Sequence, residues 1–168
     1  MAMRDANKSL VYDAEFELRF IRDNTEVDSI DFYGQTLDLP RPRKFGDLDG
    51  VQAFVNEVCA FGPVTTLWTP PGPPPKVAPR SGDRFAHYNR RYNVIAVPPH
   101  KGVHHSWAMD VLVVLHELAH FFNREKLDEP VHGLGFVNCY MDLLELVLHP
   151  TWKLLMLRAL DQRGVPLS

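Results

Sequence analysis

The sequence predicts an α+β fold for a single domain over residues 1–168, in which a small, mostly antiparallel sheet packs on helices. Three observations favour this class. Segments with helical spacing of apolar residues alternate with short strand-like runs. No internal repeat divides the chain. Its composition, 45% hydrophobic and 23% charged over 168 residues, is that of an ordinary globular domain with enough apolar side chains for a core.

The first third of the chain contains one ambiguous segment, one strand region and one clear helix. Residues 10–20 mix strand-like alternation with helix-compatible side chains, so the segment is expected to be ordered while its type stays open. Residues 28–39 predict short strands. Asp47 predicts the N-cap of a helix that runs to Ala60, and Gly62-Pro63 is expected to stop it.

The middle of the chain predicts a small sheet. Residues 64–68 are expected to form a strand, and the proline-rich residues 69–75 a stiff extended connector. Residues 83–89 and 93–97 are two strand-like runs separated by three residues, which predicts a β-hairpin.

Residues 107–122 predict a buried helix, because apolar side chains occupy nearly its whole circumference. Ser106 is expected to cap it. Burying imidazoles and carboxylates without partners would cost several kcal/mol, so its polar residues are expected to have ligands, hydrogen bonds or a metal. These polar exceptions are Asp110, His116, Glu117 and His120, and the last three form the pattern His-Glu-x-x-His.

This pattern has a specific chemical meaning on a helix. Four residues advance the chain by about 400°, so His116 and His120 project from nearly the same face, one turn apart. Both imidazoles can then reach one zinc ion at roughly 2.0–2.1 Å. Glu117 points about 100° away, where its carboxylate can hold a metal-bound water. The pattern predicts a zinc hydrolase, most often a protease, in which Glu117 moves the proton of that water.

A catalytic zinc usually takes three protein ligands, so a third ligand is expected further along the chain. His132 is the preferred candidate, because it follows a polar stretch over residues 123–130 and precedes the next helical segment. Glu145 is the rival, since some enzymes of this type take a glutamate from the following helix. A solvated helix face explains Glu145 equally well.

The C-terminal part of the chain predicts two helices. The first covers residues 133–148, with apolar residues at core spacing, and ends at His149-Pro150. The second continues to Arg163 and stops at Gly164.

Charge and composition narrow the cellular setting. A net charge of −3 gives no overall attraction to nucleic acid or to anionic membranes. No apolar run reaches the roughly 18 residues needed to span a bilayer. Residues 1–8 lack the apolar core of a secretion signal. Cys59 and Cys139 fall on apolar helix faces, so the chain is expected to be cytoplasmic and reduced, without a disulfide or a membrane partner.

Several segments together resemble a known group of proteins. The motif helix followed by His132-Gly133 is similar to SprT-like metallopeptidases and other minimal zincins, and the fuller set resembles an actinobacterial family of predicted metallohydrolases. The further matching segments are Val11-Tyr12-Asp13-Ala14-Glu15, Lys44-Phe45-Gly46-Asp47-Leu48, Ala86-His87-Tyr88 and Ile95-Ala96-Val97-Pro98. They cover most of the chain.

The resemblance implies a minimal zincin-like domain with a central HExxH helix. It makes His116, His120 and His132 the zinc ligands and Glu117 the catalytic acid and base. It names no substrate or reaction, so the expectation of a peptide or protein substrate rests on the motif. Relatives often carry Pro-Glu where this chain has Leu134-Gly135, a departure that leaves the ligand intact but alters its surroundings.

Supporting groups are predicted as sets. In zincins an edge strand before the motif helix pairs with an extended peptide, and here residues 83–89 or 93–97 are that strand by resemblance. A developing oxyanion needs a second donor, for which the candidates are Tyr88, Tyr92, His104, His105 and Tyr140. An imidazole that binds a metal usually donates its other ring N–H to a hydrogen-bond acceptor. The candidate acceptors are the nearby carboxylates of Asp110, Asp128, Asp142 and Glu145.

Two alternatives to the plain peptidase stay open. The first is a nucleic-acid-associated protease of the SprT-like kind, because six basic residues between positions 76 and 101 are opposed only by Asp83. The second is a non-catalytic, metal-stabilised binding module. Glu117 disfavours that module, because a structural zinc site needs no base and usually takes four ligands that include cysteine.

Overall fold

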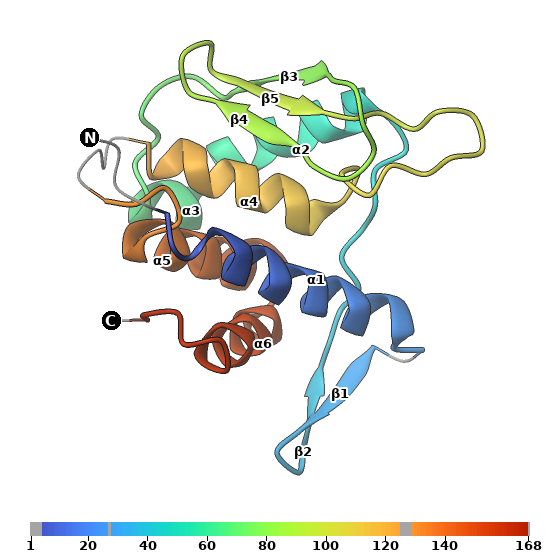
Figure 1. Ribbon diagram of the computed structural model, residues 1–168, viewed down its shortest axis with the longest axis vertical. Coiled ribbons are helices and arrows are strands. Elements are labelled where there is room, and N and C mark those ends of the chain that lie inside the picture. The colour runs from blue at the N-terminus through green and yellow to red at the C-terminus, as the bar shows by residue number, and fades with distance from the viewer. Residues whose placement is uncertain (1–4, 27, 125–128, 168) are drawn as a thin grey trace. The chain divides into compact units, whose positions relative to one another are not determined.

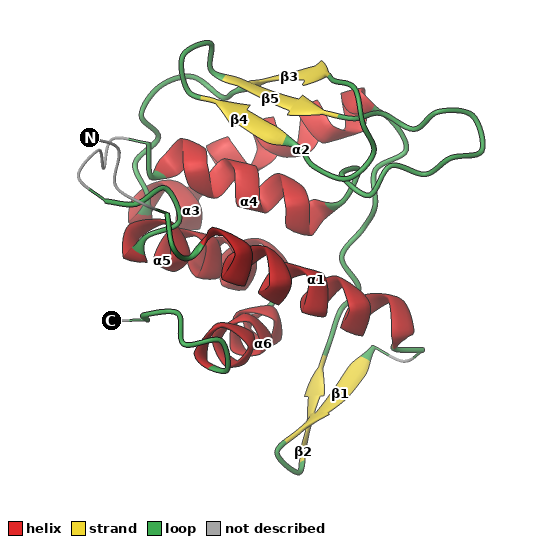
Figure 2. Cartoon of the chain, in the orientation of Figure 1, coloured by secondary structure: helices red, strands yellow, loops and turns green. Residues whose placement is uncertain are grey.

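The computed structural model describes residues 5–26, 28–124 and 129–167. The chain forms two compact units, one made of residues 1–42 and 126–168 and the other of residues 43–125. Helices and small sheets occur in both units, so the predicted α+β class is confirmed (Figure 2). Within the described ranges, no helix combines the length and apolar content that crossing a membrane requires.

The unit of residues 43–125 is built on a three-stranded sheet. Its strands are β3 (Lys76–Pro79), β4 (His87–Asn89) and β5 (Val94–Val97), in the order β3-β5-β4. β4 and β5 are antiparallel, which confirms the predicted hairpin in a shorter form. β3 was not predicted, and because it runs parallel to β5 the sheet is mixed.

Two helices pack on this sheet. α2 (Leu48–Ala60) contacts β3, α4 (Val111–Phe122) contacts β4, and the two helices contact each other (Figure 1). The predicted start of α2 is confirmed, because Asp47 is its N-cap and accepts a hydrogen bond from the backbone N–H of Gly50. β4 is one of the two edge strands of this sheet, and α4 lies beside it.

The strand predicted over residues 64–68 is wrong. Residues Gly62–Leu67 form a short helix, α3, directly after α2. Pro63 lies in its first turn, where proline has no donor to lose and its fixed φ favours the helix. Gly62-Pro63 therefore ends one helix and begins another.

The proline-rich connector is held against its own unit by side chains. The Asn93 amide donates to the carbonyl of Pro73 at 2.9 Å, and the Arg124 guanidinium donates to that of Pro71 at 3.0 Å. The connector carries no helix or strand, which agrees with the prediction of an extended segment. Because side chains bind its carbonyl groups, it acts as part of this unit.

The motif helix begins later than predicted. Asp110 is the N-cap of α4 and accepts a hydrogen bond from the N–H of Leu112 at 2.8 Å. Ser106 was predicted as the cap and is not, since its hydroxyl accepts from the N–H of Ala108 in the preceding turn. Asp110 caps the helix in place of Ser106 because it lies directly before the first helical residue. A capping side chain must reach the first free N–H groups of the helix, and a serine four residues earlier is too far away.

The unit of residues 1–42 and 126–168 starts with a long helix. α1 (Lys8–Asn24) settles the ambiguous segment as helical, with Val11, Ala14 and Leu18 buried along one face. The hairpin of β1 (Ser29–Phe32) and β2 (Gln35–Asp38) follows. Its tight turn uses positive φ at Tyr33 (51°) and Gly34 (80°), as two-residue hairpin loops require.

Three helical segments complete this unit. α5 (Leu134–Leu143) passes without a break into the π-helical turn η1 (Leu144–Leu148), so the predicted helix of residues 133–148 is confirmed with a widened last turn. His149 caps α6 (Pro150–Asp161), which contacts α1, α5 and η1. Gly164 has a φ of 70°, and the last helix ends before it as expected.

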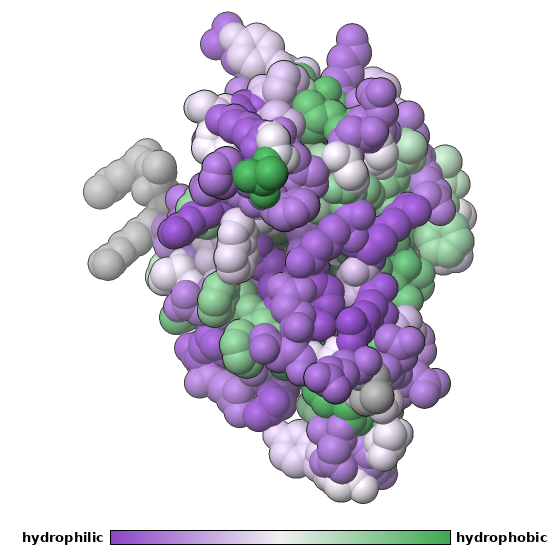
Figure 3. Space-filling view, turned by 90° about the vertical axis from the view of Figure 1, so that its right-hand side faces the viewer, coloured by the Kyte–Doolittle hydropathy of each residue, from purple (hydrophilic) through white to green (hydrophobic). Residues whose placement is uncertain are grey.

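Polar side chains cover most of the surface drawn in Figure 3, and apolar side chains appear there in small, separate groups. Cys59 and Cys139 are both buried, in agreement with their predicted place on apolar helix faces.

Candidate metal centre

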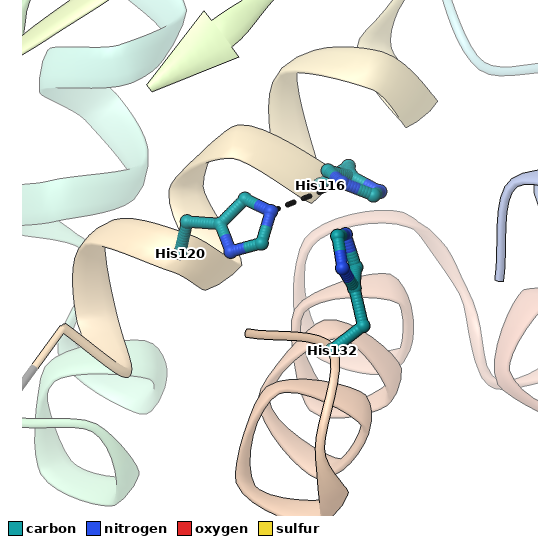
Figure 4. Close-up of side chains that lie close together, drawn as sticks. All are labelled: His116, His120 and His132. Atoms are coloured by element: carbon teal, nitrogen blue, oxygen red, sulfur yellow. Dashed lines mark hydrogen bonds between the residues drawn. The ribbon is translucent and has the colours of Figure 1, made fainter. Parts of the chain in front are cut away.

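α4 positions two histidines. Every residue of this helix except His120 is buried, and His116 is only 1% exposed. One turn of helix separates the two imidazoles, and their Nε2 atoms lie 3.2 Å apart (Figure 4). The predicted geometry is therefore present, with both rings directing the same nitrogen to a common point.

That separation fits two ligands of one metal ion. Two nitrogens at 2.0–2.1 Å from a zinc ion in tetrahedral geometry are about 3.3 Å apart. Imidazole nitrogen is a common ligand of zinc and of several other first-row ions. The spacing and the donor chemistry of His116 and His120 both suit such an ion.

Glu117 lies on α4 between the two histidines and is 3% exposed. Its Oε2 accepts a hydrogen bond from the backbone N–H of Tyr88 in β4 at 2.7 Å. A short bond from a main-chain donor to a carboxylate is strong and fixes the orientation of the side chain. β4 therefore helps to position the residue that the motif assigns as acid and base.

His132 precedes α5 and is 3% exposed. Its Nδ1 lies 2.7 Å from Oδ2 of Asp5, and its ring packs edge-on against Phe136 at a centroid distance of 4.7 Å. Burial lowers the pKa of the His132 imidazole below its ordinary value, while the hydrogen bond and charge of Asp5 act in the opposite direction.

The backbone around residue 133 requires glycine at that position. Its N–H donates to the carbonyl of Pro130 at 2.8 Å, which closes a tight turn around His132. A Cβ at position 133 would lie 2.9 Å from that carbonyl oxygen, closer than real Cβ contacts occur. Only glycine lets the backbone approach so closely.

The three predicted ligands form one group. One nitrogen each of His116, His120 and His132 can be chosen so that all three lie within 4.8 Å of one another (Figure 4). Among the residues that the structure describes, this is the group of histidines, cysteines and carboxylates compact enough to hold an ion. The chain therefore has a three-imidazole group that could bind a metal.

The rival ligand Glu145 has a different partner. It lies in η1, and its Oε2 is 2.6 Å from the ammonium nitrogen of Lys153. Asp142 lies 3.1 Å from the same ammonium group. An ion pair with lysine competes with metal coordination, so the arrangement favours His132.

Comparisons with protein-family models, with curated proteins and with solved structures found no match for this chain. The geometry of its own residues therefore carries the functional argument.

The predicted oxyanion donors divide into two kinds. The hydroxyl of Tyr88 bonds to the Asn93 side chain at 3.0 Å, and that of Tyr140 donates to Glu15 at 3.3 Å. The remaining candidates, Tyr92, His104 and His105, are exposed. The two buried hydroxyls thus have structural partners.

The predicted outer carboxylates have other partners where the structure describes them. Asp110 caps α4, and Asp142 and Glu145 bind Lys153, while Asp128 lies outside the described residues. A carboxylate that does bond to a candidate ligand is Asp5, which sequence reasoning missed. It lies 127 positions from His132, and no local pattern connects the two.

Glu15, in α1, is a buried acid that interacts with the charge of His132. Its carboxyl is 3% exposed and accepts the hydrogen bond from Tyr140. Burial raises the pKa of Glu15 to about 7, against smaller lowering effects of Arg19, the Tyr140 hydroxyl and His132.

Proposed function

We propose that this chain is a zinc-dependent hydrolase with a minimal zincin-like arrangement, and that its substrate is a peptide or protein. His116, His120 and His132 are the proposed ligands. The observation that supports this most directly is the grouping of these three imidazoles beside a buried glutamate at the second position of the motif. Three histidines with a neighbouring carboxylate suit a catalytic ion better than a structural one, which usually has four protein ligands.

When bound, zinc would supply a Lewis acid and make water acidic enough to ionise near pH 7. The remaining steps belong to the chain itself. Glu117 accepts the proton of the attacking water at its carboxylate and then delivers it to the nitrogen of the leaving amine. The N–H of Tyr88 holds Oε2 of Glu117 in place, which keeps the base oriented throughout.

We further propose β4 as the strand that borders the substrate. The alternative strand, β5, lies between β3 and β4 and has neighbours on both sides, so it offers no open edge. β4 ends the sheet beside α4, the position that strand addition requires. Because the N–H of Tyr88 already bonds to Glu117, an added peptide strand would pair through other main-chain groups of β4.

The test is hydrolysis of a peptide library by the zinc-loaded protein, with Glu117→Gln as the matched control. The variant keeps the size of the side chain and all three histidines. We expect cleavage by the wild type, a loss of roughly 10²–10⁴-fold in the variant, and equal zinc content in both. Equal cleavage by the two proteins would contradict the role of Glu117. Zinc in both without cleavage of any peptide would contradict the proposed substrate class.

A further inference from the structure

The segment before α1 holds residue 132 at three points. Oδ2 of Asp5 lies 2.7 Å from Nδ1 of His132, and Oδ1 of the same carboxylate accepts the His132 backbone N–H at 3.4 Å. The side-chain amide of Asn7 donates to the His132 carbonyl at 3.2 Å. Ring and main chain are thus both tied to residues 127 and 125 positions away.

The contact between Asp5 and the imidazole has a chemical consequence. A carboxylate accepts hydrogen bonds and does not donate them, so Nδ1 must carry the proton. A neutral imidazole has one N–H, and the proton on Nδ1 leaves the lone pair on Nε2. A metal ligand needs that lone pair, and an acceptor on the other nitrogen fixes both the tautomer and the ring orientation.

The rest of the surroundings supports a fixed ring. Phe136 packs edge-on against the imidazole, and Tyr12 lies at a centroid distance of 5.7 Å. The Asp5 side chain is 19% exposed, so it is partly shielded from water where it meets the ring. A carboxylate in such a place orients an imidazole more firmly than a solvated one.

We propose that Asp5 is a positioning residue of the metal centre, holding His132 with the proton on Nδ1 so that Nε2 faces the ion. This inference rests on the proposed function, because it takes His132 as a zinc ligand. Asp5 lies more than 110 residues before the motif residues of the proposed site, which begin at His116.

Two variants test the role of the carboxylate. Asp5→Ala removes the acceptor, and Asp5→Asn keeps an oxygen that can accept from Nδ1 but removes the charge. Asn7→Ala is the matched control, since it removes a bond to the same residue from the same segment without touching the ring. Thermal unfolding of each variant, compared with wild type, establishes that it folds.

The first readout is the tautomer of His132 in the metal-free protein, from ¹⁵N NMR of the histidine rings with His132→Ala for assignment. We expect the proton on Nδ1 in the wild type and in Asn7→Ala, and a mixture of tautomers in Asp5→Ala. A wild-type His132 with its proton on Nε2 would overturn the inference. This measurement needs no metal, so the tautomer it reports does not depend on zinc binding.

The second readout is zinc affinity, measured by competition with a chelating dye. We expect Asp5→Ala to bind zinc about 10–100-fold more weakly than wild type, Asp5→Asn to lie between them, and Asn7→Ala to stay within a few-fold. Wild-type affinity in Asp5→Ala, with binding lost in His132→Ala, would overturn the role of Asp5 alone. Absence of zinc binding in every protein would overturn the proposed function, and the role of Asp5 with it.

Discussion

The motif helix and the segment around His132 each supply candidate ligands, but different forces position them. α4 fixes His116 and His120 through its own backbone, because a helix places residues four apart on one face. His132 has no such internal guide. Its ring depends on Asp5, and its main chain on a turn that needs Gly133.

The difference shows what a local pattern can encode. Helical spacing is a property of consecutive residues, so the geometry of the first two candidate ligands follows from five letters of sequence. The placement of the third candidate, His132, depends on hydrogen bonds between residues far apart in the chain. Replacing residues that support α4 and replacing residues that support His132 should therefore affect metal binding in different ways.

The largest expected effect comes from removing a helix ligand. His120→Ala should weaken zinc binding by more than the roughly 10–100-fold that follows loss of an outer partner, because a direct metal–nitrogen bond is lost. Zinc titration of the purified variant measures this. Affinity close to that of wild type would show that His120 of α4 is not a metal ligand.

The surroundings of His132 contain Glu15, a buried acid with a raised pKa. The raised pKa of Glu15 means that the folded state retains its proton from pH 4.5 to about 7 while the unfolded state loses it. Wild-type stability should therefore fall as pH rises through this window, by at most about 3 kcal/mol from this group. Glu15→Gln should remove that fall.

Chemical denaturation of the metal-free protein at pH 5 and pH 8 measures the change. Glu57→Gln is a suitable control, because the Glu57 side chain is 72% exposed and its removal should leave the pH profile unaltered. Parallel profiles for Glu15→Gln and wild type would show that Glu15 is not protonated by burial.

Gly133→Ala tests the turn around His132 without removing a ligand. The added Cβ would meet the Pro130 carbonyl oxygen at 2.9 Å, so the turn must shift and His132 with it. We expect about a tenfold loss of zinc affinity, equivalent to about 1.4 kcal/mol. Gly46→Ala is the matched control, since a Cβ there meets nothing within 4 Å. Equal zinc affinity in both variants would mean that the turn does not position His132.

The smallest effect on the site is expected from the cap of α4. Asp110→Ala removes the acceptor for the N–H of Leu112 and should lower stability by about 1 kcal/mol. Zinc affinity of the folded variant should stay unchanged, because the helix still sets the spacing of His116 and His120. Denaturation and zinc titration of one preparation give both numbers, and a large loss of affinity would argue against that independence.

Where local signals were strong, the sequence predicted the fold well. Asp47 and the apolar spacing after it predicted α2, and His149-Pro150 marked the boundary before α6. The failures have physical causes. Pro63 was interpreted only as a helix stop, although proline also begins helices. β3 was not predicted because the strand that it pairs with, β5, lies 18 residues further along the chain.

The same division holds for the site. His116, Glu117 and His120 were predicted from spacing, and His132 from its position before a helix. Asp5 was not predicted because its partner lies 127 residues away, and a single aspartate near the start of the sequence forms no recognisable pattern. The hydrogen bond of Tyr88 to Glu117 escaped too, because its donor is a main-chain group that any residue could supply.

The most direct test of the three-histidine centre is the metal content of purified wild type, His132→Ala and Glu145→Ala by elemental analysis. The arrangement of His132 and the ion pair of Glu145 with Lys153 predict about one zinc per chain in wild type and Glu145→Ala, and none in His132→Ala. Zinc retained in His132→Ala but lost in Glu145→Ala would contradict the assignment. No metal in any of the three, even after zinc is supplied, would contradict the metal centre itself.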